Sequence, residues 1–102
     1  MLSPDELVAD LIRLGCVENT RHSSKNYRWL EIHDDTGRQI AIFNIPVSKD
    51  PIRPGTLRAG ILNPNGIRDE VHLKELLDSA DPPAALRAVL PKQGPRYRPS
   101  GQ

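Results

Sequence analysis

The chain has 102 residues, of which 37% are hydrophobic and 26% are charged, and it contains a single cysteine. This length and composition fit one globular domain with one modest core, and they exclude both a second folded domain and a disordered chain. A formal net charge of +1 argues against strong non-specific binding of nucleic acid. Cys16 alone can build neither a disulfide within the chain nor a multi-cysteine zinc site, and the three histidines lack metal-ligand spacing. We therefore expect no metal and no cofactor.

The first residues carry a strong helix-start signal. Ser3 can cap a helix, Pro4 suits its first position, and Glu6 stands where a capping box requires an acidic residue. Apolar residues then recur at helical spacing as far as Gly15, which predicts a helix over residues 4–14. Such an acidic amphipathic helix is not a signal peptide, and no apolar run is long enough to span a membrane. We expect a cytoplasmic protein without a membrane partner.

Three strands are predicted after this helix. Residues 16–20 and 26–33 favour strands and are separated by a polar loop. A turn over residues 34–37 then leads into the clearest strand, residues 39–45. Because consecutive strands joined by a tight turn pair antiparallel, the sequence predicts a small three-stranded antiparallel sheet.

The last of these strands is apolar on both of its faces. Ile40 and Ile42 point to one side of the sheet, whereas Phe43 and Ile45 point to the other. Helices can cover one face, so the second needs the C-terminal segment, a second copy of the chain or a partner protein, unless the pattern marks only a central strand. We assign Trp29, Phe43 and Ile45 to a partner interface.

Helices are expected in the remainder of the domain. Residues 56–62, 69–77 and 84–90 have helical patterns, and Pro64 and Gly66 are expected to end the first of these helices. The fold class is thus α+β, with a three-stranded antiparallel sheet, helices on one of its faces, and extra C-terminal helices.

The domain boundaries follow from composition. From residue 91 onward, prolines, glycines and basic residues show no core-forming pattern. We therefore predict one domain over residues 1–79, a helical extension over residues 80–90, and a flexible basic tail over residues 91–102.

The segment around Gly55 is typical of a phosphate-binding loop. It follows a strand, and Thr56 is a candidate N-cap that would leave free N–H groups and a helix dipole facing outward. Gly55 would let the backbone approach a ligand closely, and Lys49, Arg53 and Arg58 add positive charge nearby. An ordinary helix start with solvated basic residues explains the same pattern.

The polar loop before the second strand holds a candidate acid/base group. His22 lies there among basic and hydroxyl residues, including Arg21 and Lys25. A histidine in such surroundings suits phosphodiester cleavage, although a solvated loop histidine is the simpler explanation of the pattern. Arg28 follows in the next strand and adds to the positive charge in the middle of the chain.

The order of these elements and the run Gly55-Thr56-Leu57-Arg58 resemble the HicA-type toxins of bacterial toxin–antitoxin modules. The resemblance covers residues 6–77. Besides that run, it is carried by the opening helix over residues 6–15, Asp35-Thr36-Gly37-Arg38, Ile45-Pro46, Ile61-Leu62 and Asn65-Gly66-Ile67. It implies a fold like that of double-stranded-RNA-binding domains, metal-independent endoribonuclease activity on mRNA, and an antitoxin partner that covers the active surface.

The chain departs from the family pattern at the catalytic motif. Ser24-Lys25-Asn26 stands where the family has Gly-Ser-His, and Trp29 takes the aromatic position. Asn26 cannot exchange a proton near neutral pH, so His22 becomes the remaining candidate for acid/base chemistry. The chain is then either an mRNA-cleaving toxin or an inactive derivative that binds RNA or protein. The residues expected to hold nucleic acid are Arg21, Lys25, Arg28, Lys49, Arg53, Thr56 and Arg58.

Overall fold

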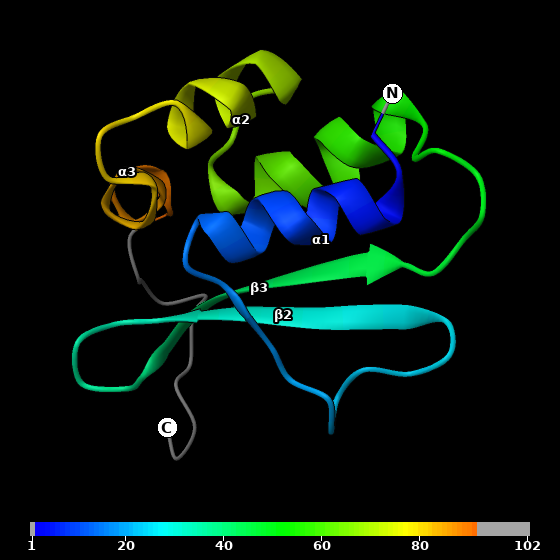
Figure 1. Cartoon of the computed structure of the whole chain (residues 1–102), viewed down its shortest axis with the longest axis horizontal. Coiled ribbons are helices and arrows are strands. Elements are labelled where there is room, and N and C mark those ends of the chain that lie inside the picture. The colour runs from blue at the N-terminus through cyan, green and yellow to red at the C-terminus, as the bar shows by residue number, and fades with distance from the viewer. Residues whose placement is uncertain (1, 92–102) are drawn as a thin grey trace.

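The computed structural model describes residues 2–91, so the predicted tail lies outside the described residues except for Pro91. The elements are α1 (Pro4–Arg13), β1 (Val17–Glu18), β2 (Tyr27–His33), β3 (Gln39–Pro46), η1 (Thr56–Leu62), η2 (Asn63–Asn65), α2 (Glu70–Leu77) and α3 (Pro82–Val89). The strands form one antiparallel sheet in the order β1-β2-β3. Figure 1 shows the helices gathered on one side of this sheet, with α1 next to it. The predicted α+β fold is confirmed.

Helix α1 begins and ends as its sequence predicts. The Ser3 hydroxyl accepts a hydrogen bond from the Glu6 N–H at 3.1 Å, and the Glu6 carboxylate accepts one from the Ser3 N–H at 3.0 Å. Gly15 follows the helix with φ 94°, a conformation that glycine adopts without strain. The face that carries Leu7 and Leu11 is fully buried against the sheet and the other helices.

The core lies between the sheet and the helices. The register places Leu30 opposite Phe43 and Ile32 opposite Ala41, and these side chains point toward the helices. Phe43 is 1% exposed and Ile45 is 0% exposed. The expectation that Phe43 and Ile45 form a partner interface is therefore wrong, because the helices cover that side of β3. We call the opposite side of the sheet the outer face.

The helical segment after β3 begins earlier than predicted. Pro54 and Gly55 are already helical, Gly55 has φ −65° and ψ −42°, and the Leu57 N–H donates to the Arg53 carbonyl at 2.9 Å. Proline fixes φ near the helical value, so Pro54 starts the turn. Thr56 lies inside this turn and makes no capping hydrogen bond, so the predicted N-cap at Thr56 is wrong.

The same segment also continues further than predicted. Residues of η1 adopt a π-helix, which passes into the 3₁₀ turn η2 at Asn63 and runs through Pro64. The end comes at Gly66, whose φ of 82° suits a helix terminus. A proline is tolerated at Pro64 because it lies in the first positions of the new turn, where its missing N–H costs no helical hydrogen bond.

The last two helices complete the helical layer. Asp69 caps α2 by accepting from the His72 N–H at 2.9 Å, and Asp81 caps α3 by accepting from the Ala84 N–H at 3.2 Å. Leu86 of α3 is fully buried in the same core cluster as the sheet residues. Within residues 2–91, no helix combines the length and the apolar character needed to cross a bilayer.

Candidate nucleic-acid interface

Two loops meet at one end of the sheet. The loop over residues 19–26 precedes β2, and the segment over residues 47–53 follows β3. The Val47 N–H donates to the Asn26 carbonyl at 2.9 Å, which joins the loops, and the Ile52 N–H donates to the Leu2 carbonyl at 2.8 Å, which anchors the second loop beside α1. In Figure 1 both loops lie at the right-hand end of the sheet.

This end of the molecule carries an excess of positive charge. Arg21 and Lys25 come from the first loop, Lys49 and Arg53 come from the second, and all four side chains are exposed. None of these four makes an ion pair with another of residues 2–91. Asp50 is the one acidic residue in the two loops. We call these four cations the basic end.

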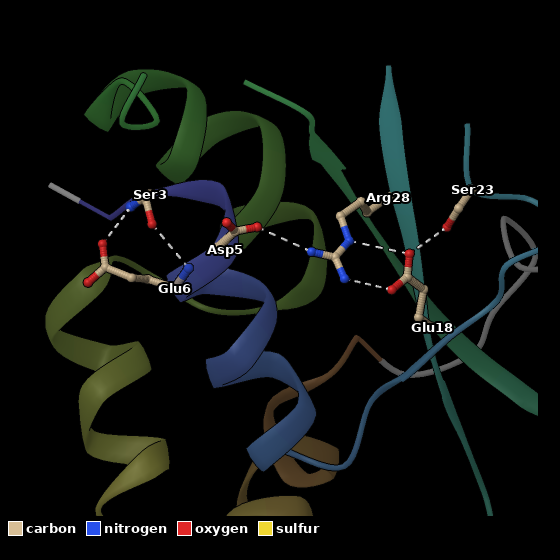
Figure 2. A network of polar contacts seen from close by, with 6 residues as sticks. All are labelled: Ser3, Asp5, Glu6, Glu18, Ser23 and Arg28. Carbon is tan, nitrogen blue, oxygen red and sulfur yellow. Dashed lines mark hydrogen bonds and ion pairs between the residues drawn. The ribbon is translucent and has the colours of Figure 1, made fainter. Parts of the chain in front are cut away.

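Arg28 does not belong to the basic end, although the sequence placed it among the nucleic-acid-binding residues. Its guanidinium lies 2.8 Å from the Glu18 carboxylate and 3.3 Å from that of Asp5, as Figure 2 shows. The Ser23 hydroxyl also donates to Glu18, at 2.9 Å. Arg28 therefore ties β2 to β1 and to α1, and its charge is already neutralised.

The same contacts set the ionisation of Glu18. The hydrogen bonds from Arg28 and then Ser23 hold the pKa of Glu18 below its usual value. The pKa of Arg28 is raised in turn by its bond to Glu18. Both groups are therefore charged at neutral pH, and the pair acts as a structural clamp between two strands.

Hydrogen bonds from side chains fix the path of the loop that carries His22. The Asn19 carboxamide oxygen accepts from the Arg21 N–H at 3.0 Å, and the Ser24 hydroxyl accepts from the Asn26 N–H at 3.1 Å. The Ser23 hydroxyl accepts from the Trp29 N–H at 2.9 Å and thus fastens the loop to β2. Such local bonds are what allow a polar loop to hold one conformation.

The outer face carries a line of polar and aromatic side chains. The His22 ring lies on Trp29, with ring centroids 4.9 Å apart and an angle of 34° between their planes. The Glu31 carboxylate accepts from Trp29 Nε1 at 2.8 Å and from Asn19 Nδ2 at 2.9 Å. His33 Nε2 lies 3.0 Å from the other carboxylate oxygen of Glu31. The Glu31 carboxylate thus links three other side chains, those of Trp29, Asn19 and His33.

Glu31 is only 7% exposed, which is unusual for an acidic residue on an open sheet face. Burial opposes its ionisation, but the hydrogen bonds from Asn19 and Trp29 together with His33 outweigh burial and hold the pKa of Glu31 below its usual value. A buried carboxylate with three partners keeps the Trp29 and His33 rings in fixed positions.

The sequence singled out some of these residues and missed others. His22, Asn26 and Lys25 lie in one loop as expected, and all three are exposed. Thr56 and Arg58 are exposed on the helical segment that begins directly after Arg53, the last residue of the second loop. The role of Glu31 was missed, although its alternation with Trp29 and His33 along the strand was visible.

The chemistry available in the described residues is limited. Among residues 2–91, no three histidine, cysteine, aspartate or glutamate side chains gather where they could hold a metal ion. Cys16 is buried, and burial raises the pKa of its thiol to about 12, so it is not a nucleophile. His22 is the imidazole nearest in sequence to the cations of the first loop.

Comparison of the chain with protein-family models, curated proteins and solved structures finds no match. The resemblance to HicA-type toxins therefore stays a prediction.

Proposed function

We propose that the protein is a HicA-like RNA-binding protein of the cytoplasm, and that it holds the RNA backbone at the basic end. One observation carries this proposal: two loops that are separated by the whole of β2 and β3 are joined by the hydrogen bond between Val47 and Asn26, and they carry four exposed cations without ion-pair partners in residues 2–91. Unpaired cations release the counterions of a polyanion when they bind it, which favours association.

The proposed RNA binding uses only the basic end, so it does not require a high net charge on the whole chain. The opposite end of the sheet is the turn between β2 and β3, where Asp34 and Asp35 are exposed or half-buried. These two carboxylates are balanced by Arg38 in the same turn and by Arg87, which lies 3.9 Å from Asp35. A polyanion is therefore attracted to the basic end in particular, and the net charge of +1 hides this local excess.

RNA cleavage is a second candidate function, and the position of His22 favours it. This imidazole lies in the same loop as Arg21 and Lys25. Removal of the proton from a ribose 2′-OH by His22 would let that oxygen bond to the adjacent phosphorus, while the bond to the 5′-oxygen breaks and this oxygen takes up a proton from the imidazolium or water. The products would be a 2′,3′-cyclic phosphate and a 5′-hydroxyl. Asn26 could only donate or accept hydrogen bonds.

A protein partner competes with both candidates. In a toxin–antitoxin module, an antitoxin-like protein would cover the RNA-binding surface, and an acidic partner segment would suit the basic end for the same electrostatic reason.

Binding of labelled RNA by the full chain tests the proposal. We expect Lys25→Glu to weaken binding at low salt and to reduce the slope of log affinity against log salt concentration by about one or two units. The matched control is Lys74→Glu on α2, which makes the same change of net charge on an exposed residue outside the basic end. Equal effects of the two substitutions would show that only net charge matters and would refute a site at the basic end.

Incubation with single-stranded and hairpin RNA in EDTA separates binding from cleavage. If His22 is the general base, wild-type protein yields cyclic-phosphate ends, and His22→Gln binds RNA without cutting it. His72→Gln serves as the control, because His72 is on α2. Intact RNA after incubation with the wild-type protein would rule out cleavage, and RNA binding would then be the only one of the two functions that stands.

A further inference from the structure

We propose that unpaired bases of single-stranded RNA stack on the outer face at the His22–Trp29 pair, beside the basic end. This inference rests on the proposed function and adds to it the kind of RNA and the place where its bases lie. The pair is the one aromatic stack found within residues 2–91.

The distribution of aromatic residues favours this proposal. The whole chain has one tryptophan, two tyrosines and one phenylalanine, so aromatic surface is scarce. Phe43 is in the core, but Tyr27 and Trp29 project from the outer face, where Tyr27 is 53% exposed. A domain this poor in aromatics would bury them if only stability mattered, because large side chains contribute most to a core.

The Trp29 ring is held ready for a ligand. Its Nε1 donates to Glu31, whose carboxylate is nearly buried and is also held by Asn19 and His33. Asn19 Oδ1 accepts hydrogen bonds from the Arg21 N–H at 3.0 Å and from the His22 N–H at 3.4 Å, which fix the start of the loop that carries His22. Stacking on a Trp29 ring that is already held in place loses little side-chain entropy, which strengthens binding.

Charge complementarity selects nucleic acid over other flat ligands. The loop that presents His22 also carries Arg21 and Lys25, so a base on the rings places its phosphates beside two cations that make no ion pair within residues 2–91. Single strands are favoured because a duplex keeps its bases stacked on each other, whereas splayed bases stack on aromatic side chains of open sheets.

The one tryptophan of the chain provides the test, because its fluorescence reports on this site alone. Titration with oligouridylate or oligoadenylate should quench Trp29 emission with the same Kd that anisotropy of labelled RNA gives. A blunt-ended RNA duplex should bind more weakly and leave the emission unchanged. His22→Ala should raise the Kd for single strands about tenfold, and His22→Phe should restore affinity, since stacking of one base is worth about that factor.

The outcomes separate the inference from the function on which it depends. RNA binding that depends on salt but does not change Trp29 emission would overturn base stacking. Equal Kd values for His22→Ala and the control His72→Ala would do the same. Either result would still agree with binding of the RNA backbone at the basic end. Absence of RNA binding would overturn both. A dimer in sedimentation that Trp29→Lys dissociates would show that a second copy covers the outer face, and would also overturn the inference.

Discussion

Removal of the Glu31 carboxylate is the sharpest test of the outer-face network. Glu31→Ala deletes the acceptor for Trp29 Nε1 and Asn19 Nδ2 and the partner of His33. Each of these bonds involves a charged acceptor that is nearly buried, but the released donors lie on the side of the sheet where water can reach them. We therefore expect a loss of about 3 kcal/mol in the free energy of unfolding, about one for each partner.

The loss of stability in Glu31→Ala should depend on pH, and the direction of this dependence follows from the pKa of Glu31. Because this pKa is lower in the folded than in the unfolded state, the carboxylate contributes stability above its unfolded pKa, and this contribution is lost as the pH falls through the folded value. Glu31→Ala should thus cost most at neutral pH, and the difference between wild type and variant should narrow in strong acid.

Urea unfolding at several pH values, followed by far-UV circular dichroism, measures the loss in the free energy of unfolding and its dependence on pH. This signal avoids the fluorescence of Trp29, which the substitution itself changes. At pH 7 a loss of this size lowers the melting temperature by about 15 °C in a domain of this length. Glu31→Gln is the matched variant, because it keeps the shape and one acceptor oxygen while it removes the charge and replaces the other oxygen with an NH₂ group, and it should cost less stability than Glu31→Ala. A loss that is equally large at pH 7 and in strong acid would refute the assignment of this stability to the ionised carboxylate.

Three further substitutions or labelling experiments test the fold. Gly66→Ala should destabilise the protein by more than about 2 kcal/mol in urea, because a Cβ there would overlap the Val89 carbonyl oxygen, whereas Gly37→Ala, at a similar positive φ but in open space, should cost only about 1 kcal/mol of backbone strain. Cys16 should react with a thiol-specific disulfide reagent only after unfolding, so its labelling rate in the native state should rise with urea. Arg28→Lys should lower stability by about 1 kcal/mol, since it loses the two-pronged contact with the carboxylate, and should leave RNA affinity unchanged.

The parts of the fold that depend on local signals could be predicted from the sequence. The capping box at Ser3 and Glu6 and the glycine after α1 are short-range features, and both act as the sequence indicates. The hairpin of β2 and β3 needs only a turn between two strand-forming runs. The error at Thr56 was also local, because Pro54 was a stronger helix-start signal than the threonine and was not read as one.

The site depended on contacts between distant residues, which a single sequence does not reveal. Arg28 was expected to bind phosphate, yet its partners Glu18 and Asp5 are 10 and 23 residues away along the chain. The meeting of the two loops depends in the same way on the bond between Val47 and Asn26. Charge alone could therefore indicate a cationic region but could not distinguish free cations from those already neutralised.

The orientation of β3 shows what reading two strands together adds. Taken alone, β3 is apolar on both faces, so it does not show which face the helices cover. In β2, Leu30 and Ile32 alternate with Glu31, and the antiparallel register places Leu30 opposite Phe43 and Glu31 opposite Ile42. Apolar side chains from both strands coincide on one face only, and that face must be the core, because a shift by one residue would turn the Glu31 carboxylate into the apolar core and expose leucine. The same alternation brings Glu31 to the outer face between the Trp29 and His33 rings, so the core and the candidate base-binding surface arise from one pattern in β2.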